Sequence, residues 1–336
     1  MTTLLSIDWL TVNYCGAFEN NPIFEFRRLS YGTRQFAEIY EVYYYGEECG
    51  SLVRGCNLPS IPPDFLQFKL SNWTLYCDYW QMILRDVVQI FGWRYHSVSR
   101  LDVCLDFHRF RNGLDPHDFI RRFLGGKYSL VSKSKFHVIG SADGRNSYEY
   151  LGIGSKSSAV KLYLYNKTKE LAEETYKKWI VDSWKLAGID SDKDVWRLEV
   201  SLSSDAMLFC DVESGEEIPI DLDFVSSYER VAKLFCTLAA KHFRFIPYSE
   251  SKNRYRKRPL ELLDLECVCW RRLDKPVTYK YNRSDKIFAA KLVAETQKKQ
   301  FLCREDRFAL VTWELQWLAD RDLLKYIEKR GLKLTL

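Results

Sequence analysis

In the stretch SRLDVCLDF, residues 99–107, two faces of different character alternate from Arg100 to Phe107. The period of two is that of a β-strand. One face carries Leu101, Val103, Leu105 and Phe107, and the other carries Arg100, Asp102, Cys104 and Asp106. Aspartate is disfavoured in the middle of a strand, so two of them on one face indicate a role beyond packing.

Two later stretches repeat this pattern. WRLEVSL, residues 196–202, sets Arg197, Glu199 and Ser201 against four apolar side chains. KLYLYNK, residues 161–167, places Lys161, Tyr163, Tyr165 and Lys167 on one face. We predict that the three strands are neighbours in one sheet, with a packed apolar core on the opposite face.

The rest of the chain predicts an α+β fold with a mostly antiparallel central sheet. The first hundred residues are rich in aromatic and β-branched residues, broken by Gly, Asn and Pro, which is typical of strands. Helical spacing marks 77–93, 115–126 and 168–187, and the pattern is mainly helical beyond about residue 222. We expect the helices to pack on one face of the sheet. The predicted parts are a β-rich region (1–60), a sheet domain (61–210) and a helical, basic C-terminal region (211–336).

Composition excludes several classes of protein. The chain has 336 residues and 46% hydrophobic content, and no stretch approaches the roughly 20 apolar residues that span a bilayer. Its N-terminus lacks the basic start and long apolar run of a signal peptide. Ten cysteines are scattered without metal-like spacing. These features predict a cytoplasmic protein with reduced thiols and no membrane partner.

Charge is unevenly distributed along the chain. Residues 1–240 hold 27 basic and 32 acidic side chains, whereas residues 241–336 hold 23 and 13. The basic end favours a polyanionic partner, with nucleic acid the first candidate, although a solvated charged surface explains it equally well. Within it, SKNRYRKRPLE (251–261) suits a nucleic-acid backbone and a stacked base. The residues concerned are Arg254, Tyr255, Arg256, Lys257 and Arg258.

If the three strands are neighbours, their shared face could break a phosphodiester bond. The carboxylates of Asp102, Glu199 and Asp106 suit Mg²⁺ or Mn²⁺. A tyrosine oxygen can attack the phosphorus, and Lys167 and Arg197 can stabilise the developing charge. Each residue also has a structural explanation: the acids can form salt bridges on a solvated face, and the tyrosines can be ordinary strand residues.

The order RLDVCLDF, YLGIGSKSSAVKLYLYNKTKE and VWRLEVSL resembles the Rep_trans or replication initiation factor family. This family contains rolling-circle plasmid replication initiators and related relaxases of mobile elements. The resemblance covers roughly residues 60–210. It implies that Tyr165 is the nicking nucleophile and that Asp102 and Glu199 bind the metal, with Asp106 a further acid of the first motif. Lys156 stands where the family has arginine, and Tyr163 replaces a second arginine, so Tyr163 stays open as a nucleophile that shares or takes the role.

The resemblance implies metal-dependent DNA nicking and joining at an origin through a 5′-phosphotyrosine link, for replication or for mobile-element transfer. Arg100, Lys156 and Lys161 are then DNA contacts, and the N-terminal strands and the basic C-terminal part recognise the origin. The implied partners are origin DNA (a single-stranded or hairpin nick site with flanking duplex), a host helicase and a second copy of the chain. Two alternatives remain: a non-catalytic DNA-binding regulator with this fold, and a metal nuclease that uses water.

Overall fold

The computed structural model describes residues 2–56, 61–132, 134–140, 148–173, 176–248, 258–265 and 270–273. These residues fall in one compact unit, Met1–Leu273. Its centre is a ten-stranded sheet with the order β2-β3-β4-β5-β1-β6-β11-β10-β9-β8, in which all paired neighbours are antiparallel. The strands are β1 (Leu4–Cys15), β2 (Phe24–Arg28), β3 (Phe36–Tyr44), β4 (Glu47–Cys56), β5 (Phe65–Leu70), β6 (Arg94–Phe107), β8 (Phe136–Gly140), β9 (Tyr148–Ile153), β10 (Val160–Asn166) and β11 (Trp196–Ser203).

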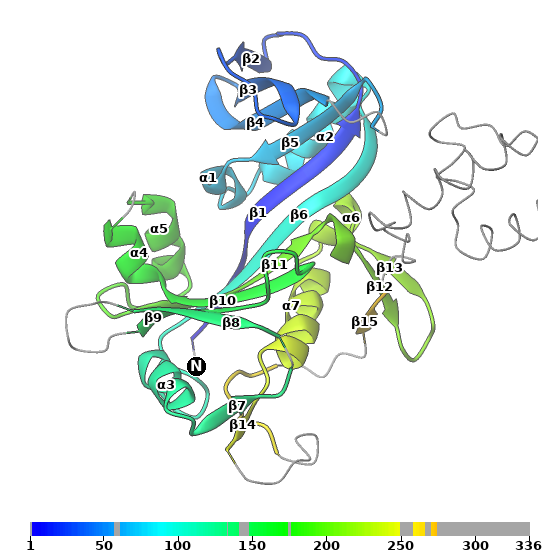
Figure 1. Cartoon of the computed structure of the whole chain (residues 1–336). Coiled ribbons are helices and arrows are strands. Elements are labelled where there is room, and N and C mark those ends of the chain that lie inside the picture. Colours follow the sequence, from blue (N-terminus) through cyan, green and yellow to red (C-terminus); the bar gives the residue numbers. More distant parts are fainter. Residues whose placement is uncertain are drawn as a thin grey trace, which may run out of the picture. The chain divides into compact units, whose positions relative to one another are not determined.

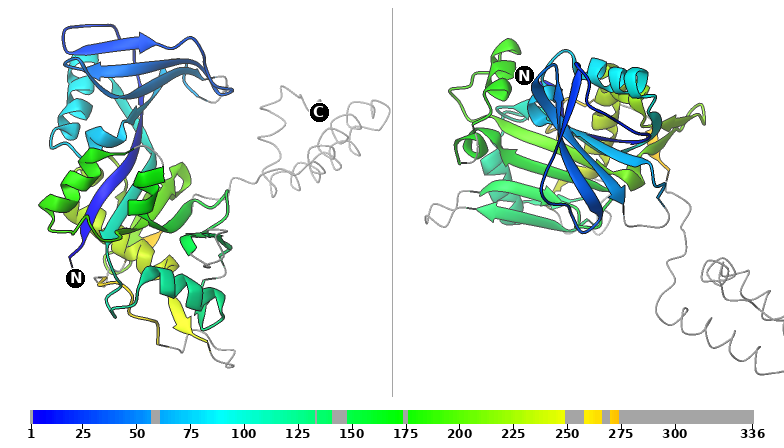
Figure 2. Two further views of the ribbon diagram at one scale, coloured as in Figure 1. Left: turned by 90° about the vertical axis from the view of Figure 1, so that its left-hand side faces the viewer. Right: turned by 90° about the horizontal axis from the view of Figure 1, so that it is seen from above.

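The remaining elements surround this sheet (Figure 1). The helices are α1 (Asn72–Leu75), α2 (Trp80–Phe91), α3 (Pro116–Leu124), α4 (Lys167–Glu173), α5 (Lys178–Leu186), α6 (Leu222–Val225) and α7 (Tyr228–His242), with a 3₁₀ turn at Ser204–Ala206. Two small sheets pair β12 (Leu208–Asp211) with β13 (Glu217–Pro219) and β15 (Trp270–Arg272), and β7 (Tyr128–Leu130) with β14 (Phe245–Pro247). The large sheet is twisted, so that β2–β4 and β8–β10 run in different directions (Figure 2).

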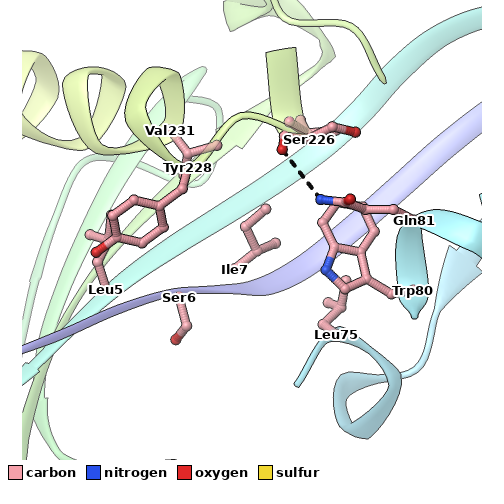
Figure 3. A pocket seen from close by; sticks show the side chains of 10 residues that line it. Leu5, Ser6, Ile7, Leu75, Trp80, Gln81, Ser226, Tyr228 and Val231 are labelled. Carbon is pink, nitrogen blue, oxygen red and sulfur yellow. Dashed lines mark hydrogen bonds between the residues drawn. The ribbon is translucent and has the colours of Figure 1, made fainter. Parts of the chain in front are cut away.

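One face of the large sheet is the main hydrophobic core. Val103, Val200 and Leu162 lie side by side on it from β6, β11 and β10, and all three are buried. Helices α2, α3 and α7 contribute apolar residues to the same cluster. Between α2 and α7 a pocket of about 230 Å³ opens over Leu5 and Ile7 of β1 (Figure 3). The Gln81 side-chain amide at its edge donates a hydrogen bond to the backbone carbonyl of Ser226.

Helix ends follow local sequence signals. Asp115 caps α3 by accepting a hydrogen bond from the backbone N–H of His117 at 2.9 Å, and Pro116 occupies the first turn. Gly92 ends α2 in the left-handed conformation (φ 64°), which a residue with a side chain adopts at a cost.

The predicted α+β class and antiparallel sheet are confirmed. Helices lie on both faces, however: α5 packs on the face opposite the main core, where Trp184 bonds to Asp106. The segment predicted as one helix over 168–187 contains α4 and α5 as separate helices. The sheet also runs across the expected boundary at residue 60, since β1 lies between β5 and β6. The helices predicted beyond residue 273 lie outside the described residues.

Strand β1 contains a β-bulge at Asp8. Ile7 lies opposite Val103 and Trp9 lies opposite Asp102, so β1 carries one residue more than β6 over this step. Ile7 and Leu10 therefore both belong to the main core. Asp8 and Trp9 both reach the other face, where they contact Arg197 and Arg100 respectively.

None of the helices in the described ranges is both long and apolar enough to cross a membrane.

We expect Phe119→Ala to lower the free energy of unfolding by about 3–5 kcal/mol, because a fully buried ring is lost from a cluster of aromatic side chains. Urea unfolding at pH 7 measures this change. Leu124→Ala in the same helix is the matched control, since Leu124 is 40% exposed and its loss should cost far less. Equal losses in the two variants would contradict this description of the core.

Candidate active site

The register of β6, β11 and β10 brings the three polar strand faces together. Asp106 lies opposite Arg197, which lies opposite Tyr165. Two residues further along β11, Glu199 lies opposite Tyr163. Two residues beyond that, Ser201 lies opposite Asp102 on one side and Lys161 on the other. The adjacency predicted from sequence is therefore confirmed. We call this surface, opposite the main core, the polar face.

Arg197 occupies the buried floor of the polar face. Its Nε and one terminal nitrogen each donate to an oxygen of Asp106 at 2.7 Å, and both side chains are fully buried. The guanidinium also reaches Asp8 and the hydroxyl of Tyr76, the latter at 3.0 Å. Trp184 of α5 donates its indole N–H to Asp106 at 2.7 Å. This is a complete charge-assisted network in which the buried cation is paired.

The placement bears on two expected roles. Both oxygens of Asp106 are already bonded to Arg197, so binding a metal would break a buried ion pair. Arg197 itself is fully buried beneath the surface. Arg197 and Asp106 therefore hold β11 and β6 together beneath the exposed part of the polar face.

Asp8 is a member of the site that sequence reasoning did not identify. Its carboxylate accepts from Arg197, from the Asn72 amide at 3.1 Å and from the Tyr76 hydroxyl at 3.1 Å. Burial alone would raise the pKa of Asp8, but Arg197 and then Lys167 outweigh it and lower the pKa to about 2. A mid-strand aspartate next to a tryptophan was the available signal, but strict alternation does not predict that both face the same way.

Asp102 is buried, with only 3% of its side chain exposed, and it pairs with Arg100 at 2.6 Å. The Arg100 side chain is 41% exposed, so this pair sits at the edge of the polar face. Burial raises the pKa of Asp102, and the hydrogen bond and charge of Arg100 oppose the rise.

Glu199 and Tyr165 form the most specific contact of the site. The Tyr165 hydroxyl donates to Oε2 of Glu199 at 2.9 Å. Burial first, and then the charges of Asp102 and Asp8, raise the pKa of Glu199 to about 7. Burial and the Glu199 charge also raise the pKa of Tyr165 well above its usual value. The pair thus holds a weakly acidic phenol next to a carboxylate whose pKa suits proton transfer near neutral pH.

Tyr163 and Tyr150 extend the site towards β8. The Tyr150 ring lies 5.9 Å from that of Tyr163 and 6.4 Å from that of Tyr165. His137 reaches the Tyr150 hydroxyl at 3.3 Å, and its ring fills the space above Gly152, where an added Cβ would come within 2.3 Å of it. Burial, then Glu199 and Asp102, raise the pKa of Tyr163.

The expected basic residues divide by position. Lys167 is buried and paired with Glu170, and its Nζ lies 5.5 Å from the centre of the Tyr165 ring. Lys161 is half-buried on the polar face, and Lys156 is exposed in the turn before β10. Of these three, Lys167 is therefore the cation that lies against the Tyr165 ring.

Four of the five DNA contacts predicted in the stretch 251–261 fall outside the described residues. Arg254, Tyr255, Arg256 and Lys257 belong to that part of the chain. Arg258 is described, exposed and paired with Glu261 at 2.9 Å.

The donor set of the polar face fits a hard divalent cation. Asp102 and Glu199 are buried carboxylates that repel one another, and a cation would relieve this repulsion. Both oxygens of Asp102 accept from Arg100, but Arg100 is 41% exposed and, unlike Arg197, can turn to solvent when a cation binds. Oε2 of Glu199 accepts from Tyr165, which leaves Oε1 for a ligand. In the described ranges no three His, Cys, Asp or Glu side chains form a ready-made metal site. Two carboxylates completed by water and a substrate phosphate are, however, a common environment for Mg²⁺.

No protein-family model matches the chain, and no curated protein matches its sequence. The fold is similar to a solved structure described as the rolling circle replication initiator protein from Geobacillus stearothermophilus. The TM-score is 0.46 and the sequence identity 13%, and the match covers 77% of this chain and 92% of that chain. A TM-score of this size marks a distant likeness in outline, so the function of this chain has to be inferred from its own residues.

We expect Asp8→Asn to lower the free energy of unfolding at pH 7 by about 2 kcal/mol, because the pKa of Asp8 is about 2 in the folded protein instead of 3.8. A lowered pKa stabilises the fold above about pH 4, and this contribution is lost as the pH falls towards 2. Urea unfolding of wild type and variant should show the same difference in the free energy of unfolding at pH 7 and pH 5, and a smaller difference at pH 3. A gap that widens at pH 3 would contradict the Asp8–Arg197 pairing, and Asp192→Asn, an exposed change, is the control.

Proposed function

We propose that this protein is a metal-dependent DNA nickase that forms a 5′-phosphotyrosine link and later rejoins the strand, as in the initiation of rolling-circle replication or mobile-element transfer. The observation that carries the proposal is the hydrogen bond from Tyr165 to Glu199 beside the buried Asp102. It combines a nucleophile, a proton acceptor and a second carboxylate on one face. The motif resemblance assigns the same three residues.

In the proposed reaction, Glu199 takes the proton of Tyr165 as the phenol oxygen approaches phosphorus. The bond from phosphorus to the 3′ oxygen breaks as the bond to the tyrosine oxygen forms. The 3′ oxygen leaves as a hydroxyl, so the proton lost by tyrosine is recovered by the leaving group. Because one phosphoester replaces another, rejoining by the reverse step needs no ATP.

The surrounding residues hold this geometry. Arg197 and Asp106 fix β11 against β6, and so fix Glu199 relative to Asp102. Lys167 lies against the Tyr165 ring, and Arg197 is the cation that opposes the rise in the Tyr165 pKa caused by burial and by Glu199. A Mg²⁺ or Mn²⁺ ion held by Asp102 and Glu199 would neutralise charge on the phosphate. Arg100, Lys161 and Lys156 lie on or beside the polar face and would contact the DNA backbone.

Tyr163 is the second candidate for the nucleophile. It lies directly opposite Glu199 on the same face, and burial, Glu199 and Asp102 all affect its pKa. Tyr165 is favoured because its hydroxyl already bonds to Glu199. The two tyrosines can be separated by single substitutions.

We expect Tyr165→Phe to abolish the covalent protein–DNA adduct, a loss on the order of 10³-fold or more in rate, while DNA binding is retained. The measurement uses labelled single-stranded oligonucleotides from the origin region of the encoding element. They are incubated with the protein and Mn²⁺ or chelator, and the adduct is detected on a denaturing gel.

The matched variant Tyr163→Phe should still form the adduct. An adduct lost only in Tyr163→Phe would transfer the role to Tyr163. Cleavage without an adduct would favour the nuclease that uses water, and binding without cleavage would favour a regulator.

We also expect Mn²⁺ to raise the melting temperature of the wild-type protein, because a ligand that binds only the folded state stabilises it, by about 2.7 kcal/mol at 100 times its Kd. The shift should be absent in Glu199→Gln and Asp102→Asn and unchanged in Asp192→Asn, an exposed control. An equal shift in all four proteins would place the ion elsewhere. Thermal unfolding with and without Mn²⁺ tests this without DNA.

A further inference from the structure

A groove of about 320 Å³ lies on the polar face next to Asp102 and has no part in the chemistry described above. It crosses β4, β5, β1 and β6. Its polar lining includes Ser51, Gln67, Lys69, Trp9, Thr11 and Arg100. Apart from Arg100, none of these residues belongs to the expected site.

The indole of Trp9 lines the groove, and two cations lie over its rings. Thr11 lies opposite Lys69 on one side and opposite Arg100 on the other, so these strands place the two basic residues on either side of β1. Lys69 Nζ lies 3.6 Å and Arg100 Cζ 3.8 Å from the centre of a Trp9 ring. The indole N–H donates to Thr11 at 2.8 Å, which fixes the orientation of the ring.

The groove concentrates positive charge. Lys69 forms no ion pair with any residue in the described ranges. Burial, and then Arg100 and Lys177, lower its pKa, whereas Glu48 opposes this. Arg100 is already paired with Asp102, whereas an incoming anion would give Lys69 the partner that it lacks among the described residues.

The floor of the groove is polar and tied together. Gln67 donates to Asn13 at 3.2 Å and to Ser99 at 3.3 Å, and Asn13 donates to Ser97 at 3.0 Å. These side chains come from β5, β1 and β6 and are fixed before any ligand arrives. A ligand would therefore meet a rigid polar sheet surface.

We propose that this groove binds a nucleotide of the single-stranded DNA next to the scissile phosphate, with its phosphate paired to Lys69 and its base on the Trp9 ring surface that Lys69 covers in this structure. The inference rests on the proposed nickase function. Neighbouring strands are about 4.8 Å apart, so the strand of Lys69 lies about 10 Å from the strand of Asp102 and about 14 Å from that of Glu199. A nucleotide next to the scissile phosphate can span this separation. Aromatic stacking needs an exposed base face, which a duplex does not offer.

Binding of a labelled single-stranded oligonucleotide, followed by fluorescence anisotropy in chelator so that nothing is cleaved, tests the proposal. We expect Trp9→Leu to weaken binding about 5- to 100-fold, the range found when one base–aromatic stack is lost. Lys69→Ala should reduce the slope of log K against log salt by about 0.7, the value for one phosphate contact on a single strand. Binding of a duplex of the same sequence should change much less in Trp9→Leu.

The matched control is Lys241→Ala. Lys241 is exposed near the end of α7, which packs on the main core and so on the opposite side of the sheet. Thermal unfolding establishes that each variant is folded, and Trp9→Phe, which keeps an aromatic face, should retain most of the affinity.

The outcomes separate the two proposals. If folded Trp9→Leu and Lys69→Ala bind single strands as well as Lys241→Ala does, the groove proposal is overturned, whether or not Tyr165 forms an adduct. If both variants bind weakly but no protein forms an adduct with Mn²⁺, the groove stands and the nickase proposal fails. An equal loss of duplex binding in Trp9→Leu would also overturn base stacking in the groove.

Discussion

The buried guanidinium of Arg197 is the interaction on which the polar face depends. It joins β11 to β6 through Asp106, to β1 through Asp8, and to the residue after α1 through Tyr76. Leaving this buried charge without a partner would lower the free energy of unfolding by about 3–5 kcal/mol. The sheet is therefore stable only when the strands pair in the register that brings these partners to Arg197. The same register sets Glu199 and Tyr165 side by side. Stability and site geometry are therefore linked through one side chain.

Much of the site could be predicted because β-strands impose a simple rule. The period of two holds for the carboxylates of β6 and β11 and for the two tyrosines of β10. Burying such polar groups in an apolar core would be costly, so they must lie on the other face. Their shared face in β6, β11 and β10 follows from the need to put the apolar sides together. The antiparallel sheet and the caps of α3 followed from equally local signals.

Other features could not be predicted because they depend on contacts between distant segments. Nothing in WRLEVSL shows that Arg197 lies beneath the surface with its hydrogen bonds taken up by Asp106 and Asp8. The position of α5 over the polar face depends on Trp184 reaching Asp106. Asp8 and Trp9 were missed because a bulge breaks the alternation on which the prediction relied. The sequence pattern of a strand predicts which face a side chain lies on, whereas its hydrogen-bond partners depend on the tertiary fold.

The bulge in β1 makes strand length, and not only residue identity, a determinant of the site. Deleting Ile7, which leaves Asp8 and Trp9 in place, would restore strict alternation along β1. A carboxylate and an indole that are adjacent in sequence could then no longer face the same side. One of them would turn into the main core, even if every other side chain of the polar face were kept. Among homologous chains, an insertion or deletion here would therefore be a sharper sign of altered chemistry than a substitution.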